Sequence, residues 1–176
     1  ANPFNGFIKD CHDCEFAMQQ KKHFTKLEFL QTMQMMQDKI KNNEDVFNNS
    51  LLLGNAFYNI SHFGNARLFY QGNIIPSWTT PFGYDNFNRK LITNNNQAEI
   101  YYQKALQNAE NKEQKAKAFY MLSKCERNEY YNRQYYFSLT DSWALWDVEV
   151  NFLAWNGFKE LKQNYSDTRF YQQVIN

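Results

Sequence analysis

The chain has 176 residues and a mass of 21.2 kDa, a length that fits one domain with a substantial core. Its 19 Lys and Arg residues nearly balance 18 Asp and Glu residues, and a net charge of +1 argues against a nucleic-acid-binding surface or a polybasic membrane anchor. Aromatic residues make up 18% of the chain, whereas Gly (6) and Pro (3) are scarce, which excludes a disordered chain and disfavours a β-sandwich. No apolar run approaches the roughly 20 residues that span a bilayer.

Residues 1–23 are predicted to form an irregular segment, because Pro3 and Gly6 interrupt any helical pattern. The segment contains Cys11 and Cys14, and two thiols at this spacing can form a disulfide or supply half of a zinc site. No second Cys pair completes a zinc site, and no βαβ pattern supports a thioredoxin-like site. The two cysteines are therefore a candidate structural disulfide or plain thiols, with metal binding and redox function as alternatives.

Two amphipathic helices are predicted over residues 25–40 and 46–60. Thr25 and Glu28 have the spacing of a capping box, in which each side chain accepts a hydrogen bond from a backbone N–H group. Apolar residues then recur at steps of three or four, which predicts one buried face on each helix. In the first helix they are Leu27, Leu30, Met33, Met36 and Ile40, and in the second they are Val46, Leu53, Phe57 and Ile60, with Ser50 in the same stripe.

A third helix is predicted over residues 63–71, with Ala66 and Tyr70 on one face. The helical pattern then stops. Residues 72–96 contain two prolines, two glycines and the run Asn94-Asn95-Asn96, and they are predicted to form a long insert loop. A loop of this length inside a compact domain is uncommon and is often functional.

Aromatic side chains gather in the predicted insert. Trp78, Phe82 and Tyr84 are candidate binding residues, because such rings anchor both protein interfaces and sugar rings with little loss of entropy. The alternative is that these rings pack back over the end of a helix pair and close the core.

Helical patterns resume in the second half of the chain, over residues 98–109 and 118–125. Cys125 lies on the apolar stripe of the second of these and is predicted to be a buried small hydrophobe. Residues 128–140 are rich in tyrosine and fit no clear pattern. A further helix is predicted from about Asp141 to Leu161, and a last helical stretch covers residues 165–175.

Residues 53–70 resemble a tetratricopeptide repeat. The order is Leu53-Gly54, two small residues, the aromatic pair Phe57-Tyr58, a turn, and then Ala66 and Tyr70. Residues 98–106 resemble the second helix of such a repeat, and residues 118–123 resemble the opening of the next one. The residues that carry this second similarity are Ala98, Tyr102, Ala105 and Leu122. Leu53 and Leu122 are 69 positions apart (122 − 53), about twice the period of 34.

The resemblance implies an all-α fold, a degenerate tetratricopeptide-like α-solenoid of antiparallel helix pairs with aromatic-rich insert loops, covering residues 24–176. It also implies that Gly54 and Ala66 lie where two helices cross, since only small side chains let the backbones approach. Phe57 and the other aromatic residues of the repeat then fill the space around that crossing. The insert and the tyrosine-rich stretch depart from the regular repeat.

Proteins of this class are mainly scaffolds that bind other proteins in a concave groove, so the resemblance implies a non-enzymatic interaction scaffold. The Asn-rich and aromatic-rich composition also resembles that of repeat-containing envelope lipoproteins of Bacteroidetes-type bacteria. We therefore expect a component of a larger cell-envelope or secretion complex, and we expect the sequence to be part of a longer chain.

The alternative function is a glycan-binding module similar to SusD-type surface proteins, which would use the aromatic insert. No ordered set of nucleophile, base and acid is present in the sequence, and no Gly-rich phosphate loop. We accordingly expect no catalytic residue, no metal site and no cofactor, and we expect other proteins as partners.

Overall fold

The structure is a computed structural model that describes residues 2–6, 22–66, 81–137 and 155–175. Within these residues every regular element is a helix and no strand is present, so the predicted all-α class is confirmed. The α-helices are α1 (Lys26–Lys41), α2 (Val46–Asn59), α3 (Asn86–Thr93), α4 (Asn96–Gln107), α5 (Lys112–Tyr131), α6 (Asn156–Tyr165) and α7 (Arg169–Ile175). A short 3₁₀ helix, η3 (Pro81–Gly83), precedes α3, and a π-helical turn, η4 (Asn132–Tyr136), extends α5.

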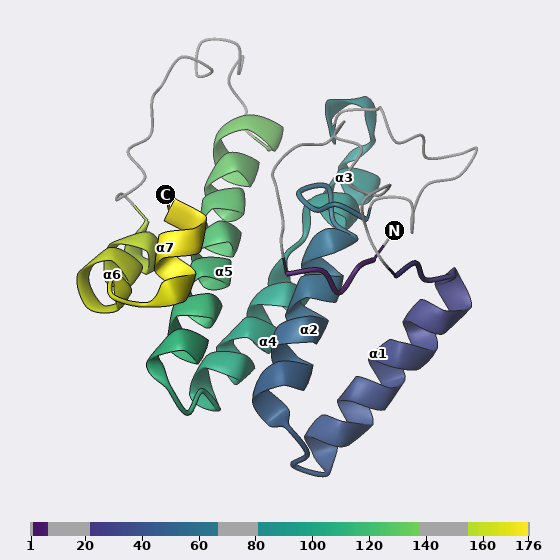
Figure 1. Ribbon diagram of the computed structural model, residues 1–176. Helices are drawn as coiled ribbons and strands as arrows, with labels where there is room; N and C mark the ends of the chain where they lie inside the picture. The colour runs from purple at the N-terminus through teal and green to yellow at the C-terminus, as the bar shows by residue number, and fades with distance from the viewer. Residues whose placement is uncertain (1, 7–21, 67–80, 138–154, 176) are drawn as a thin grey trace.

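The longer helices form a row in which neighbours run in opposite directions (Figure 1). α2 packs between α1 and α4, α4 packs on α5, and α5 carries α6 and α7. Among the described elements, α2 and α4 make the most extensive contacts, although residues 60–95 separate these two helices in the chain. The centre of the fold therefore depends on a pairing between distant segments.

α1 begins at the predicted capping box. Thr25 Oγ1 accepts a hydrogen bond from the N–H of Glu28 at 3.2 Å, and the Glu28 carboxylate accepts one from the N–H of Thr25 at 2.8 Å. The bond from the Thr25 backbone is the main reason why the pKa of Glu28 lies below its usual value. These reciprocal bonds satisfy two amide groups that the first helical turn leaves without partners.

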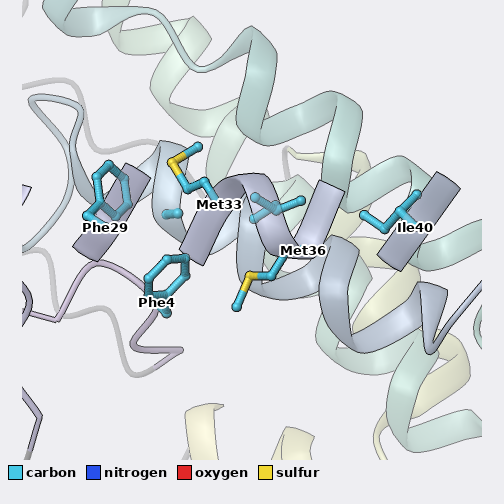
Figure 2. Packing of buried hydrophobic residues seen from close by; sticks show 7 residues of the cluster. Phe4, Phe29, Met33, Met36 and Ile40 are labelled. Carbon is cyan, nitrogen blue, oxygen red and sulfur yellow. The ribbon is translucent and has the colours of Figure 1, made fainter. Parts of the chain in front are cut away.

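The buried face of α1 differs from the predicted stripe at its N-terminal end. Leu27 and Leu30 are 65% and 61% exposed, and Phe29 is buried instead. The reason is the N-terminal segment, which brings Phe4 against this end of the helix, with ring centroids of Phe4 and Phe29 5.5 Å apart (Figure 2). The remaining predicted residues of the stripe are buried, namely Met33, Met36 and Ile40.

The chain does not continue as a helix after α2. Residues 60–66 form turns, and the Ala66 N–H donates to the Asn59 carbonyl oxygen at 2.8 Å. Gly64 lies directly against the backbone of Asn59, closer than a side chain would allow, so the chain folds back on the end of α2. The predicted helix therefore does not begin at Phe63, and its remaining residues, 67–71, lie outside the described part.

The prediction of an insert loop over residues 72–96 is wrong where it can be tested. Residues 72–80 lie outside the described part, but η3 and α3 occupy much of the rest, and α4 already begins at Asn96. Asp85 is the N-cap of α3, and its carboxylate accepts hydrogen bonds from the N–H groups of Phe87 and Asn88 at 2.9 and 3.0 Å. The asparagine run is a short link between two helices rather than part of a long loop.

α5 is longer than its apolar pattern predicts, because the start of the tyrosine-rich stretch continues it through Tyr131 and η4. The predicted helix from Asp141 to Leu161 is described only from residue 155 onward. The backbone at Trp155 is extended (φ −85°, ψ 128°) and α6 begins at Asn156, so the predicted helix does not run unbroken to Leu161. The last predicted stretch, 165–175, contains the end of α6 and all of α7.

Two carboxylates of α5 cap the helices that follow it. Glu126 accepts hydrogen bonds from the first two N–H groups of α6 at 3.2 and 3.3 Å. Glu113 does the same for the first two N–H groups of α7, at 2.6 and 3.0 Å. A carboxylate at a helix N-terminus satisfies amide groups and complements the positive end of the helix dipole, so α5 positions both helices.

Within the described residues no helix has both the length and the apolar character needed to cross a lipid bilayer.

Candidate functional site

The crossing of α2 and α4 is built around Gly54. A Cβ atom at this position would lie 2.5 Å from Cδ1 of Tyr102, far inside normal packing distance. Tyr102 is fully buried, and its hydroxyl donates to Oδ1 of Asn55 at 3.0 Å. The crossing predicted for Gly54 is therefore present, but its partner is α4, whereas Ala66 lies buried in the turns after α2.

α5 and α6 cross in an equivalent way. A Cβ atom on Gly157 would lie 3.0 Å from Cβ of Ser123 and closer still to its hydroxyl oxygen. Ser123 follows Leu122 as Gly54 follows Leu53, so the two small crossing residues are also 69 positions apart (123 − 54). The small residue at this position thus lies against the partner helix in both pairs.

Buried asparagines also occur at equivalent positions of α2 and α5. Asn59 and Asn128 are again 69 positions apart (128 − 59), and both are fully buried. Asn128 Nδ2 donates to the Tyr58 hydroxyl at 2.9 Å, which ties α5 to α2. Residue types alone did not predict these polar positions, although their common spacing from Leu53 and Leu122 was available in the sequence.

The other predicted repeat residues that the structure describes lie in or beside the core. Phe57 is partly buried, and its ring stacks on Tyr101 of α4, with centroids 5.6 Å apart and planes 7° from parallel. Leu122 is partly buried in the cluster around Tyr58 and Tyr102. The fully buried members are Leu53, Tyr58, Ala98 and Ala105.

Four residues singled out by the sequence lie outside the described part. They are Cys11, Cys14, Tyr70 and Trp78. The third cysteine, Cys125, is buried as predicted and forms no disulfide, and burial raises the pKa of its thiol well above the usual value. A thiol of that kind is a poor nucleophile.

The residues of the aromatic insert that the structure describes lie around Arg89. Its guanidinium group donates to the carbonyl oxygens of Pro81, Tyr84 and Tyr136, each at 2.9 Å. Phe82 is 42% exposed, and its ring lies 5.4 Å from that of Tyr136 at an angle of 59°. Phe82 is therefore neither buried in the core nor coplanar with the neighbouring ring.

His62 connects the end of α2 to α3 and η4. Its backbone N–H donates to the Ile92 carbonyl oxygen at 2.7 Å, and Nε2 lies 3.3 Å from the Tyr136 hydroxyl. Burial lowers the pKa of this histidine from 6.5 to about 4, so the ring is neutral near pH 7. His62 itself lies in the turns that follow α2.

An apolar groove of about 430 Å³ lies between α1 and α3, beside the C-terminal end of α2. Leu30 of α1 and Leu91 of α3 line it, and these leucines are 61% and 63% exposed. Phe29 and Phe57 also line the groove, and Lys26 is the one charged residue among the described residues that do so. Large apolar side chains left in water in this way are typical of a surface that binds a partner.

Sequence reasoning missed this groove because it assigned residues 72–96 to a loop. A usable signal was present, since Phe87 and Leu91 have the spacing of four that places two residues on one helix face. Phe87 is 75% exposed and extends the apolar surface of α3 by one turn.

No group of three or more histidine, cysteine or acidic residues that could hold a metal ion occurs in the described part of the chain. Comparison with known protein families, with curated proteins and with solved structures finds no match to the chain. The geometry of its own residues is thus the basis for the functional proposal.

Proposed function

We propose that the chain is a non-enzymatic protein-interaction scaffold of the tetratricopeptide-like class. The observation that carries this proposal is the groove between α1 and α3, in which Leu30 and Leu91 leave apolar surface exposed. An apolar partner surface that covers these two side chains would remove them from water. The binding free energy gained in this way is roughly 25 cal/mol for each Å² of apolar surface buried. Apolar grooves between helices commonly accept segments of other proteins.

The equivalent crossings of α2 with α4 and of α5 with α6 support the assignment to a degenerate helical repeat. In both pairs a small residue one position after a leucine lies against the partner helix, and the two sites are 69 positions apart. Such a spacing fits two repeats of a solenoid, with η3 and α3 as an insertion between the helices of the first pair.

We further propose that the scaffold works in a larger complex of the cell envelope or of a secretion system. Support for this context comes from the Asn-rich and aromatic-rich composition, with 23 Asn residues and 18% aromatics. The partners of such a scaffold are other proteins, and no cofactor is needed for the binding.

Affinity purification of the full-length protein from its own source, with mass spectrometry of the co-purified proteins, tests the scaffold role. We expect stoichiometric partners that are lost from a Leu30→Asp variant, because the new carboxylate would lie in the groove. Leu27→Asp is the matched control. It changes the same residue type on the same helix at a similarly exposed position (65%) that does not line the groove.

A protein that purifies alone would contradict the scaffold role. Partners that are retained equally by both variants would contradict the groove as the binding surface.

The alternative proposal, a glycan-binding module, is favoured by the exposed ring of Phe82 and by exposed polar residues beside it, including Asp85 and Asn86. Its test is a glycan array with wild-type protein, Phe82→Ala and Trp78→Ala. Binding that is lost in either variant would support a glycan site. An array without any binding would remove this alternative.

A further inference from the structure

The N-terminal residues form a small turn with its own internal hydrogen bonds. The side-chain Oδ1 of Asn2 accepts a bond from the N–H of Phe4 at 3.0 Å, and the N–H of Asn5 donates to the Asn2 carbonyl oxygen at 3.3 Å. Proline at the second position and asparagine at the first are the residues that favour such a turn. Two local hydrogen bonds thus help to hold the turn Asn2-Pro3-Phe4-Asn5.

This turn lies on α2 through its backbone carbonyl groups. Asn59 Nδ2 donates to the carbonyl oxygens of Pro3 at 2.7 Å and of Asn5 at 3.0 Å. One helical turn earlier, Asn55 Nδ2 donates to the Phe4 carbonyl oxygen at 3.4 Å. Two amide side chains of one helix thus bind three consecutive carbonyl groups.

Both amide groups are held in position by other parts of the protein. Oδ1 of Asn55 accepts the Tyr102 hydroxyl at 3.0 Å, and Oδ1 of Asn59 accepts the N–H of Asn65 at 3.3 Å. Because each oxygen is engaged on the protein side, each NH₂ group points toward the turn. Donors fixed in advance in this way lose little entropy when a ligand binds.

The side chains of the turn supply apolar anchors. Pro3 is fully buried, and Phe4 packs in a hydrophobic cluster that includes Phe29 of α1 (Figure 2) and Leu53 of α2. The Phe4 ring makes an edge contact with Phe24 at 5.1 Å and a tilted contact with Phe29 at 5.5 Å. A preformed turn, a proline and an aromatic anchor are the parts of a short peptide ligand in its receptor.

We propose that the face formed by α1 and α2 is a binding site for a Pro-Phe turn of another polypeptide, and that residues 2–6 occupy it as a displaceable internal ligand. The partner is a protein segment that presents the pattern Asn-Pro-Phe-Asn. Recognition combines the ring contacts of the phenylalanine with Phe24 and Phe29 and the hydrogen bonds that Asn55 and Asn59 donate to carbonyl oxygens. This site is a second surface beside the groove between α1 and α3, so it goes beyond the proposed scaffold role.

The experiment uses the whole chain with a protease recognition sequence inserted within residues 7–21, cleaved after folding. Cleavage removes the high local concentration that a covalent connection gives to the internal ligand. We expect the N-terminal fragment to dissociate on dilution while the helical circular dichroism signal is retained. A fluorescent peptide with the sequence of residues 2–6 and blocked ends should then bind saturably, at least tenfold more tightly than to uncleaved protein.

The control is the same peptide carrying Phe4→Ala, which keeps the carbonyl groups but loses the anchor and should bind at least tenfold more weakly. A fragment that leaves only when the helices melt, or whose departure unfolds them, would show that residues 2–6 are a fixed part of the core and would overturn the proposal. Equal binding of both peptides would overturn it as well. No other protein takes part in this experiment, so its failure leaves the scaffold proposal untouched.

Discussion

Replacing Gly54 by alanine adds one methyl group at the closest approach of α2 and α4. In an exposed helix interior this substitution would stabilise the fold by about 1 kcal/mol, because alanine is the better helix former. At this site the new Cβ would lie 2.5 Å from a ring carbon of Tyr102. The sign of the measured effect therefore distinguishes a packed crossing from an ordinary helical position.

The expected loss of stability in Gly54→Ala depends on how firmly the ring of Tyr102 is held. Tyr102 is fully buried and its hydroxyl is bonded to Asn55, so the ring cannot turn aside and the helices must move apart. Overfilling a packed core costs about 1–3 kcal/mol, and a rigid neighbour places this site at the upper end. After subtracting the gain in helix propensity, we expect a net loss of about 2 kcal/mol and a Tm lower by about 4–8 °C for a chain of this size.

Urea denaturation followed by circular dichroism measures the loss, and a double-mutant cycle with Tyr102→Leu identifies its cause. Leucine removes the ring that the methyl group would strike, so Gly54→Ala should be neutral or stabilising in that background. A Gly54→Ala protein as stable as wild type, or an equal loss in both backgrounds, would refute the close crossing of α2 and α4.

Three further predictions concern polar groups. Glu126→Ala should lower the free energy of unfolding, measured by urea denaturation, by about 1 kcal/mol, because α6 loses its N-terminal cap. The control is Glu129→Ala, which removes an exposed carboxylate of the same helix and should change that free energy by less than about half as much. Arg89→Lys should destabilise by about 2 kcal/mol in the same assay, since an ammonium group cannot reproduce the planar fork that donates to three carbonyl oxygens at 2.9 Å. Burial lowers the pKa of His62 from 6.5 to about 4. Between pH 6.5 and about pH 4, the unfolded chain therefore binds a proton at this histidine that the folded chain does not bind. Stability should therefore fall on the order of 3 kcal/mol as the pH drops through this window, and denaturation of His62→Gln across the same pH range should lack that part of the loss.

Features that depend on neighbours in the chain were predictable from the sequence. The capping box at Thr25 and the extent of α2 follow from local hydrogen bonding and from apolar spacing. The exposure of Leu27 and Leu30 was not predictable in this way. Spacing places them on the same stripe as Met33, but the ring that fixes the buried face comes from Phe4, more than twenty positions earlier.

The groove was missed for a related reason. Prolines, glycines and an asparagine run made residues 72–96 look like a loop, while the N-cap of α3 depends on a single carboxylate, Asp85. α3 has only eight residues, and of its apolar side chains Ile92 is buried whereas Phe87 and Leu91 are exposed, so the apolar positions do not mark one buried face. Exposed leucines such as Leu91 carry no local signal that separates a binding surface from a buried face.

The long separation of α2 from α4 also sets an order of assembly. α4 and α5 are joined by residues 108–111 alone, whereas residues 60–95 must be closed into a loop before α2 can pack on α4. The entropy of loop closure grows with the logarithm of loop length, and for these two lengths the difference is about 2 kcal/mol. The α4–α5 hairpin should therefore form early in folding and provide the surface on which α2 docks, so substitutions in α2 should mainly accelerate unfolding.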